Sequence, residues 1–232
     1  MFNVDTSVER SVRSMMHRVF GWMSAALAVT ATLAFTVAHT PILVNMIFKN
    51  HWVFISLILA ELGLVFYLSY ALAKNNIAVN TAYLIFFIYA ALTGVTMAAI
   101  FLVYSLPSIA VTFATTAGMF GAMALYGYFT NKDLTSMGSI LFMALIGLIL
   151  GTVINLFLKN SMLDYFISGI GVVIFSLLTA YDVQKIKQLG QQLLINGYGT
   201  SKAALFGALT LYLDFINLFM YLLQFLGKKR ND

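Results

Sequence analysis

Seven long apolar runs, separated by short polar stretches, fill the chain from residue 20 onward. The runs are Phe20–Ala38, Trp52–Ala73, Ile77–Val103, Ser108–Phe129, Met137–Leu158, Leu163–Tyr181 and Ala203–Leu226. A helix needs about 20 apolar residues to cross the hydrocarbon core of a bilayer. The pattern therefore predicts an all-α membrane protein with seven transmembrane helices. We expect residues 1–232 to form a single domain, in which residues 1–19 are a cytoplasmic N-terminal segment.

The stretches between the runs predict where the chain leaves the membrane. The only two prolines, Pro41 and Pro107, fall between runs. Because proline lacks an N–H group and breaks helices, we expect loops at both. The stretch Val183–Lys202, between the last two runs, predicts a long loop.

Basic residues between the runs indicate the orientation. With the N-terminus inside, eight basic residues lie in inner segments and two, Lys49 and Lys159, in outer loops. The eight are Arg10, Arg13, Arg18, Lys74, Lys132, Lys185, Lys187 and Lys202. The positive-inside rule then predicts a cytoplasmic N-terminus and, after seven spans, an outside C-terminus. The basic tail Lys228-Lys229-Arg230 instead favours a cytoplasmic C-terminus, although charges late in the chain usually weigh less than early ones.

Composition narrows the function classes. The chain is 61% hydrophobic and 9% charged, against about 25% charged in soluble domains, which leaves no room for a separate soluble domain. It has no cysteine, so thiolate metal sites and cysteine nucleophiles are excluded. The formal net charge of +5 lies mostly at span ends, which indicates topology and anionic lipids as partners and not nucleic acid.

Three acidic residues, Glu61, Asp182 and Asp214, interrupt the apolar runs. A charge near the centre of a membrane helix costs about 2.5–3.5 kcal/mol on insertion scales, so such acids usually serve a function. Asp182 ends the sixth run, and Asp214 comes eleven residues after the start of the seventh run at Ala203, about 16 Å along a helix. The two meet at one level if residues 203–208 project beyond the hydrocarbon. The alternative is a structural role, in which each acid hydrogen-bonds between helices.

Small and polar residues recur at helical spacing on several runs. Gly147 with Gly151, and Gly118 with Ala122, form small-xxx-small pairs that suggest close helix packing. On the last run, one polar stripe faces other helices or water. It lines a pathway, or alternatively forms interhelical hydrogen bonds, and consists of Thr210, Asp214, Asn217 and Tyr221. Glu61, midway along the second run, is expected to face the bundle interior and to line the same pathway, the alternative being a structural role.

No enzyme is expected from the other reactive side chains. His17, His39 and His51 all sit at span edges, where they cannot build a buried serine–histidine pair, and no Gly-x-Ser-x-Gly motif occurs. We therefore expect no catalytic residues and no cofactor.

Five stretches resemble the Bax inhibitor family, and most closely its compact bacterial members. They are Phe20-Gly21-Trp22-Met23, residues 116–122 (TAGMFGA), residues 130–134 (TNKDL), residues 178–185 (LTAYDVQK) and residues 207–219 (GALTLYLDFINLF). The resemblance covers nearly the whole chain, and its last two stretches are highly specific.

The resemblance implies six helices around a central seventh, and a pH-sensitive calcium leak of the bacterial inner membrane. By resemblance, Asp182 and Asp214 are the aspartate pair that senses pH and gates the leak, and Glu61 matches an acid that some members carry in the second span. Some members place an arginine near the inner end of that span as a counter-ion to the pair; here Lys74 is the candidate. No metal site is firmly assigned, beyond weak calcium binding at Asp182 and Asp214.

Two other functions stay open at this point. An intramembrane aspartyl protease also needs paired aspartates on its sixth and seventh spans, but its glycines before the second aspartate are replaced here by Leu211, Tyr212 and Leu213. The second alternative is a regulator that binds other membrane proteins and transports nothing. Calcium, protons, lipids and membrane protein partners are thus the expected partners.

Overall fold

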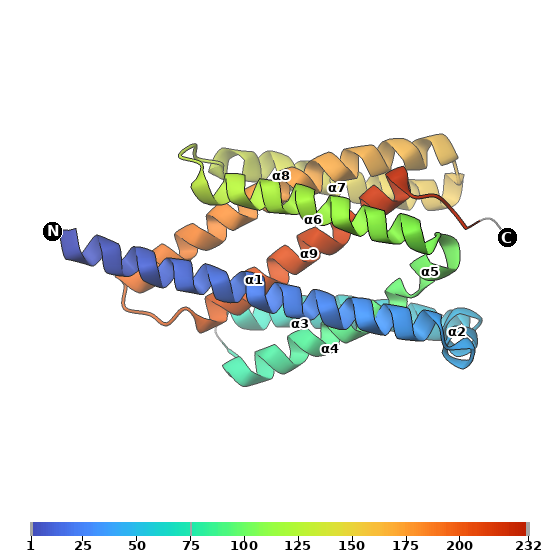
Figure 1. Ribbon diagram of the computed structural model, residues 1–232, viewed down its shortest axis with the longest axis horizontal. Helices are drawn as coiled ribbons and strands as arrows, with labels where there is room; N and C mark the ends of the chain where they lie inside the picture. Colours follow the sequence, from blue (N-terminus) through green and yellow to red (C-terminus); the bar gives the residue numbers. More distant parts are fainter. Residues whose placement is uncertain (1, 75, 231–232) are drawn as a thin grey trace. The chain divides into compact units, whose positions relative to one another are not determined.

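The computed structural model describes residues 2–74 and 76–230, with side chains from Ser7 onward, and its secondary structure is helical (Figure 1). The helices are α1 (Phe2–Ala38), α2 (Pro41–Phe48), α3 (His51–Ala73), α4 (Val79–Met97), α5 (Ala99–Val103), α6 (Leu106–Phe129), α7 (Thr135–Leu158), α8 (Ser161–Ile195) and α9 (Ser201–Leu226).

Seven of these segments in the described residues are long and apolar enough to cross a membrane, which confirms the predicted fold class. Helices α4 and α5 together form one of them, Val79–Val103. The seventh span is the most enclosed: 67% of its apolar window is buried, against 6% for α3. Helix α9 therefore packs against protein along most of its length.

Several predicted boundaries were wrong because helices continue beyond their apolar runs. Helix α1 begins at Phe2, so most of the expected N-terminal segment is helical, and α8 continues from Tyr181 to Ile195. The expected long loop at Val183–Lys202 therefore shrinks to residues 196–200. The apolar residues Val183 and Ile186 are buried, so one face of α8 continues to find packing partners after it stops being lipid-soluble.

Both prolines lie in the first turns of helices and not in loops. Pro41 begins α2, a short helix that the apolar pattern did not predict, and Pro107 lies at the start of α6. The first turn of a helix has N–H groups without intrahelical partners, so proline costs little there.

The chain divides into two compact units. Of the described residues, the first contains residues 2–74, 76–104, 190–212 and 230, and the second contains residues 105–189 and 213–229. In the first unit, α1 packs along α4, and α3 packs on the same helix. A Cβ atom on Gly94 of α4 would lie 2.7 Å from the Thr30 carbonyl oxygen of α1, so only glycine permits this approach.

The second unit contains α6, α7, most of α8 and the second half of α9. The Phe215 ring of α9 packs edge-on against the rings of Phe113 and Phe120 of α6. A Cβ atom on Gly127 of α6 would lie only 2.1 Å from the carbonyl oxygen of Ala180 on α8. Backbone therefore touches backbone between α6 and α8, two residues before Asp182. The predicted small-residue contacts are found only in part: Gly118 and Gly147 have no neighbouring atoms within 4 Å of a Cβ position, whereas a Cβ atom on Gly151 would lie 3.7 Å from Ile167 of α8.

Candidate functional site

Asp182 on α8 and Asp214 on α9 lie together in the second unit. Their carboxyl groups are within hydrogen-bonding range of each other. Asp214 is the more enclosed, at 5% exposed, while Asp182 is half-buried. Among the described residues, no hydrogen-bond donor reaches the buried Oδ2 atom of Asp214. A proton on either carboxyl would supply a donor at this contact, since two ionised carboxylates have only acceptors to offer.

Lys185 lies one helical turn beyond Asp182 on α8 and interacts with it electrostatically. Its Nζ atom also lies 5.3 Å from the centre of the Tyr181 ring, a cation–π distance. The sequence pattern does not pair this cation with Asp182, because it predicts a loop from Val183 onward. Once α8 is known to continue to Ile195, the spacing of three residues puts both charges on one helix face.

The Asp182 segment of α8 is fixed to the loop between α6 and α7. Gln184 donates from Nε2 to the Lys132 carbonyl (2.8 Å) and accepts at Oε1 from the Leu134 N–H (2.8 Å). Lys187 donates to the Tyr128 carbonyl at 2.8 Å. One side-chain amide thereby satisfies two backbone groups of residues that flank Asp133, and Gln184 itself is 7% exposed. The contact of Gly127 with Ala180 adds a second restraint on the same helix.

The residues of the polar stripe on α9 do not share one kind of contact: some bond within their own helix, and one packs against α8. Thr210 donates to the Phe206 carbonyl at 3.0 Å, and Asn217 donates to the Leu213 carbonyl at 2.8 Å, both within their own helix. Tyr221 stacks on Phe175 of α8 with ring centres 5.7 Å apart. Their role as a pathway lining stays a prediction.

Glu61 lies in the first unit and has a partner that the sequence did not reveal. Thr96 of α4 donates to Glu61 Oε1 on α3 at 2.8 Å. In the same unit, the Thr30 hydroxyl donates to the Ala90 carbonyl (2.8 Å), so Tyr212 of α9 donates to Thr30 (2.7 Å). Hydroxyl groups thus line the inside of this unit, and their partners come from helices too far apart in sequence for spacing to predict.

Two further candidates are a metal site and the counter-ion Lys74. In the described part of the chain, no group of three or more His, Cys, Asp or Glu side chains is arranged to hold a metal ion. Lys74 is an exposed residue that ends α3 in the first unit, and its part as a counter-ion stays a prediction.

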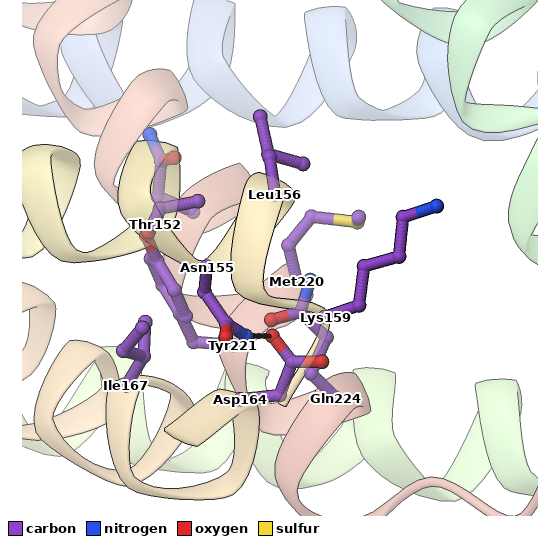
Figure 2. A pocket seen from close by; sticks show the side chains of 10 residues that line it. Thr152, Asn155, Leu156, Lys159, Asp164, Ile167, Met220, Tyr221 and Gln224 are labelled. Carbon is purple, nitrogen blue, oxygen red and sulfur yellow. Dashed lines mark hydrogen bonds between the residues drawn. The ribbon is translucent and has the colours of Figure 1, made fainter. Parts of the chain in front are cut away.

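A cavity of about 570 Å³, lined by both polar and apolar side chains, lies in the second unit, where α7 ends and α8 begins (Figure 2). Asn217 and Tyr221 of the predicted stripe line it, whereas Glu61 and Thr210 are not among its lining residues. In its wall, Asn155 of α7 donates a hydrogen bond from Nδ2 to Oδ1 of Asp164 on α8. This cavity was not predicted, since Asp164 reads in the sequence as an ordinary span-end acid.

Comparison with known proteins adds a family and its relatives. The sequence model of the family described as "Inhibitor of apoptosis-promoting Bax1" matches residues 12–231. The chain is 46% identical over 222 residues to inner membrane protein YbhL of Escherichia coli K12, covering 94% of this chain and 93% of that protein. It is 46% identical to a Borreliella burgdorferi protein over 93% of this chain and 92% of the other. A Rickettsia prowazekii protein is 41% identical, over 96% and 93%.

Proposed function

This chain belongs to the Bax inhibitor family, and from that premise we propose that it is a pH-sensitive leak for calcium and other cations. The observation that carries the proposal is the contact of the Asp182 and Asp214 carboxyl groups inside a membrane-spanning protein. We place it in the bacterial inner membrane, which the name of its Escherichia coli relative supports.

The proton is the switch in this mechanism. When Asp182 and Asp214 share a proton, the two carboxyls hydrogen-bond and keep α8 against α9. When that proton leaves, two negative charges at hydrogen-bonding range repel each other in an environment with little water. The helices then separate locally, or a cation enters between the carboxylates. The leak is therefore the greater at the higher pH.

The ion passes the pair and does not stay. Calcium takes six to eight oxygen ligands, and two carboxylates supply at most four. Backbone carbonyls, water and the Asn217 amide oxygen add weak ligands, which suits transit better than storage. Glu61 and Thr210 are proposed to line other parts of the pathway. No cofactor is required.

An intramembrane aspartyl protease would need the same two carboxylates. A substrate backbone must then reach Asp214 past the residues that precede it. These are large here, and Tyr212 is fully buried and hydrogen-bonded to Thr30. This crowding favours the leak over peptide hydrolysis.

The test is calcium entry into liposomes that contain the protein and an internal calcium dye, followed across pH 5 to 8. We expect Asp214→Asn to change the flux and its pH dependence more than Glu61→Gln does. Asp214 has a carboxyl partner, whereas Glu61 already satisfies one oxygen with Thr96. Equal effects of the two variants would remove the aspartate pair from its central role. No flux in wild type at any pH would favour a regulator without transport, and cleavage of added membrane peptides would favour a protease.

We also propose a cytoplasmic N-terminus and an outside C-terminus, from the eight-to-two distribution of basic residues between inner and outer segments. Because the chain has no cysteine, single cysteines at Asn3 and Asn231 report each end cleanly. Both positions lie outside the residues whose side chains are described. We expect an impermeant thiol reagent added outside intact cells to label only the second. Labelling of both from one side would contradict seven spans.

A further inference from the structure

The cavity of the second unit is lined by side chains from three helices. Asn155 comes from α7, Asp164 from α8, and Asn217, Tyr221 and Gln224 from the last turns of α9. Figure 2 shows Asn155, Asp164, Tyr221 and Gln224 close together near the α7–α8 turn. Amide, hydroxyl and carboxylate oxygens therefore face a common space, in a region where exposed neighbours such as Phe157 are apolar.

The cavity wall is fixed in place. Besides its bond to Asp164, Asn155 donates to the Asn160 carbonyl at 3.1 Å and accepts from the Asn160 N–H at 3.1 Å. Asn155 is only 4% exposed, so this network is built into the turn between α7 and α8. The Asp164 carboxylate is thus held at the cavity by a buried amide.

Neither aspartate of the pair lines the cavity, but one of its lining residues on α9 is close to Asp214 in sequence. Asn217 lines it and follows Asp214 by three residues, which places the two on one helix face about 4.5 Å apart along the axis. The Asn217 amide nitrogen is engaged by the Leu213 carbonyl, so its oxygen is the atom left to bind a ligand. Asp214 itself keeps a buried oxygen that no donor reaches in the described part of the chain.

We propose that this cavity is an aqueous vestibule that admits small hydrated cations and delivers them to Asp214. Asp164 is the charge that attracts them. Lys159 lies at the rim as the residue that ends α7, and its side chain extends away from Asp164 in Figure 2. Its ammonium opposes cation entry. The direction of transport rests on the function proposed above, but access to the vestibule does not.

Thiol chemistry tests the vestibule without any transport. In the cysteine-free chain, reconstituted in liposomes, Asn217→Cys is treated with a cationic and with an anionic methanethiosulfonate reagent. Each rate is divided by that of the same reagent with a free thiol. We expect the cationic reagent to be favoured about fivefold, because a carboxylate in a cleft raises the local concentration of cations. Asp164→Asn should bring the ratio close to one, and Lys159→Gln should raise it.

Three controls keep the result specific. Leu150 is exposed on α7, a helix long and apolar enough to cross the membrane, and does not line the cavity, so we expect Leu150→Cys to face lipid and to react with neither reagent. Lys49→Gln removes the same charge from the other outer loop and should leave the ratio unchanged. Gln224→Cys, nearer the rim, replaces Asn217→Cys if that variant does not fold.

The outcomes separate the two proposals. An unreactive cavity thiol, or one that favours the anionic reagent, overturns the vestibule even if wild type conducts calcium. A cation preference that depends on Asp164, in a protein without calcium flux, supports the vestibule and overturns the leak. Reaction of Leu150→Cys at the same ratio would also overturn it, since the selectivity would then not belong to the cavity.

Discussion

Replacement of Gly127 by alanine is the sharpest test of how the aspartate pair is positioned. The new Cβ atom would lie 2.1 Å from the Ala180 carbonyl oxygen, and 2.8 Å and 2.9 Å from the carbonyl carbon and Cα of the same residue. All three atoms are backbone, so no side chain can rotate away. Ordinary contact begins at 3.4 Å, so α6 and α8 must separate by about 1 Å. Asp182, two residues after Ala180, moves with α8.

The expected cost follows from two opposing effects. Alanine in a helix is favoured over glycine by about 0.5–1 kcal/mol where space is free. Overpacking a close contact costs about 1–3 kcal/mol, and more where only backbone can move. Since only backbone can move here, the overpacking cost is expected near the upper end of that range, and the gain in helix propensity leaves a net loss of about 2 kcal/mol in the free energy of unfolding for Gly127→Ala.

Gly118→Ala is the matched control on the same helix, because nothing lies within 4 Å of its Cβ position. The two variants add the same methyl group to α6 and should differ by about 2 kcal/mol or more. For a domain of 150–250 residues this corresponds to about 4–8 °C in melting temperature. Thermal unfolding in detergent measures the difference, and calcium flux across pH shows whether the displaced Asp182 still shares its proton.

Equal melting temperatures for Gly127→Ala and Gly118→Ala would refute the close approach of α6 and α8. A strongly destabilised Gly127→Ala with wild-type pH dependence of flux would refute the narrower claim that this contact positions Asp182. Only the combination of lower stability and altered pH dependence supports both parts.

Two further predictions concern individual hydrogen bonds. Tyr212→Phe removes a buried donor to Thr30, whose own bond to the Ala90 carbonyl remains, and should cost about 0.6–1.7 kcal/mol in thermal unfolding; an unchanged melting temperature would contradict the bond. Hydrogen bonds from Thr135 lower the pKa of Asp133 below its ordinary value of 3.8, so the stability it contributes is complete above pH 3.8 and is lost as the pH falls through the lowered pKa. Wild type should therefore lose melting temperature below about pH 4 relative to Asp133→Asn, and parallel profiles would count against these hydrogen bonds from Thr135.

Span number was predictable from the sequence because lipid imposes a length on every crossing helix. The limits of the spans were not, since a helix that leaves the bilayer continues as long as one face finds packing. Val183 and Ile186 are the signal in α8: both are apolar, at helical spacing, and buried. Gln184 and Lys185 between them broke the apolar run without breaking the helix.

The candidate site shows the same division. Intramembrane charge identified Asp182 and Asp214, because an acid in an apolar run is costly whatever the fold. Hydrogen-bond partners on other helices could not be predicted from the sequence, as Thr96 beside Glu61 and Asn155 beside Asp164 show. Glycine spacing misled for a related reason: Gly118 is free of neighbours, and the spacing of residues along one helix does not say which face meets another.

The two hydrogen bonds of the Gln184 side chain to the loop between α6 and α7 couple the position of that loop to the position of α8. A side-chain amide can donate one hydrogen bond and accept another at the same time. If the loop moved independently of α8, it would therefore lose the bonds of Gln184 to both Lys132 and Leu134. Any turn of α8 that accompanies loss of the shared proton would be carried two residues along the helix and out to an accessible segment. The ionisation of a hidden carboxyl pair would thus become readable at the protein surface, by a fluorescent label or by another protein.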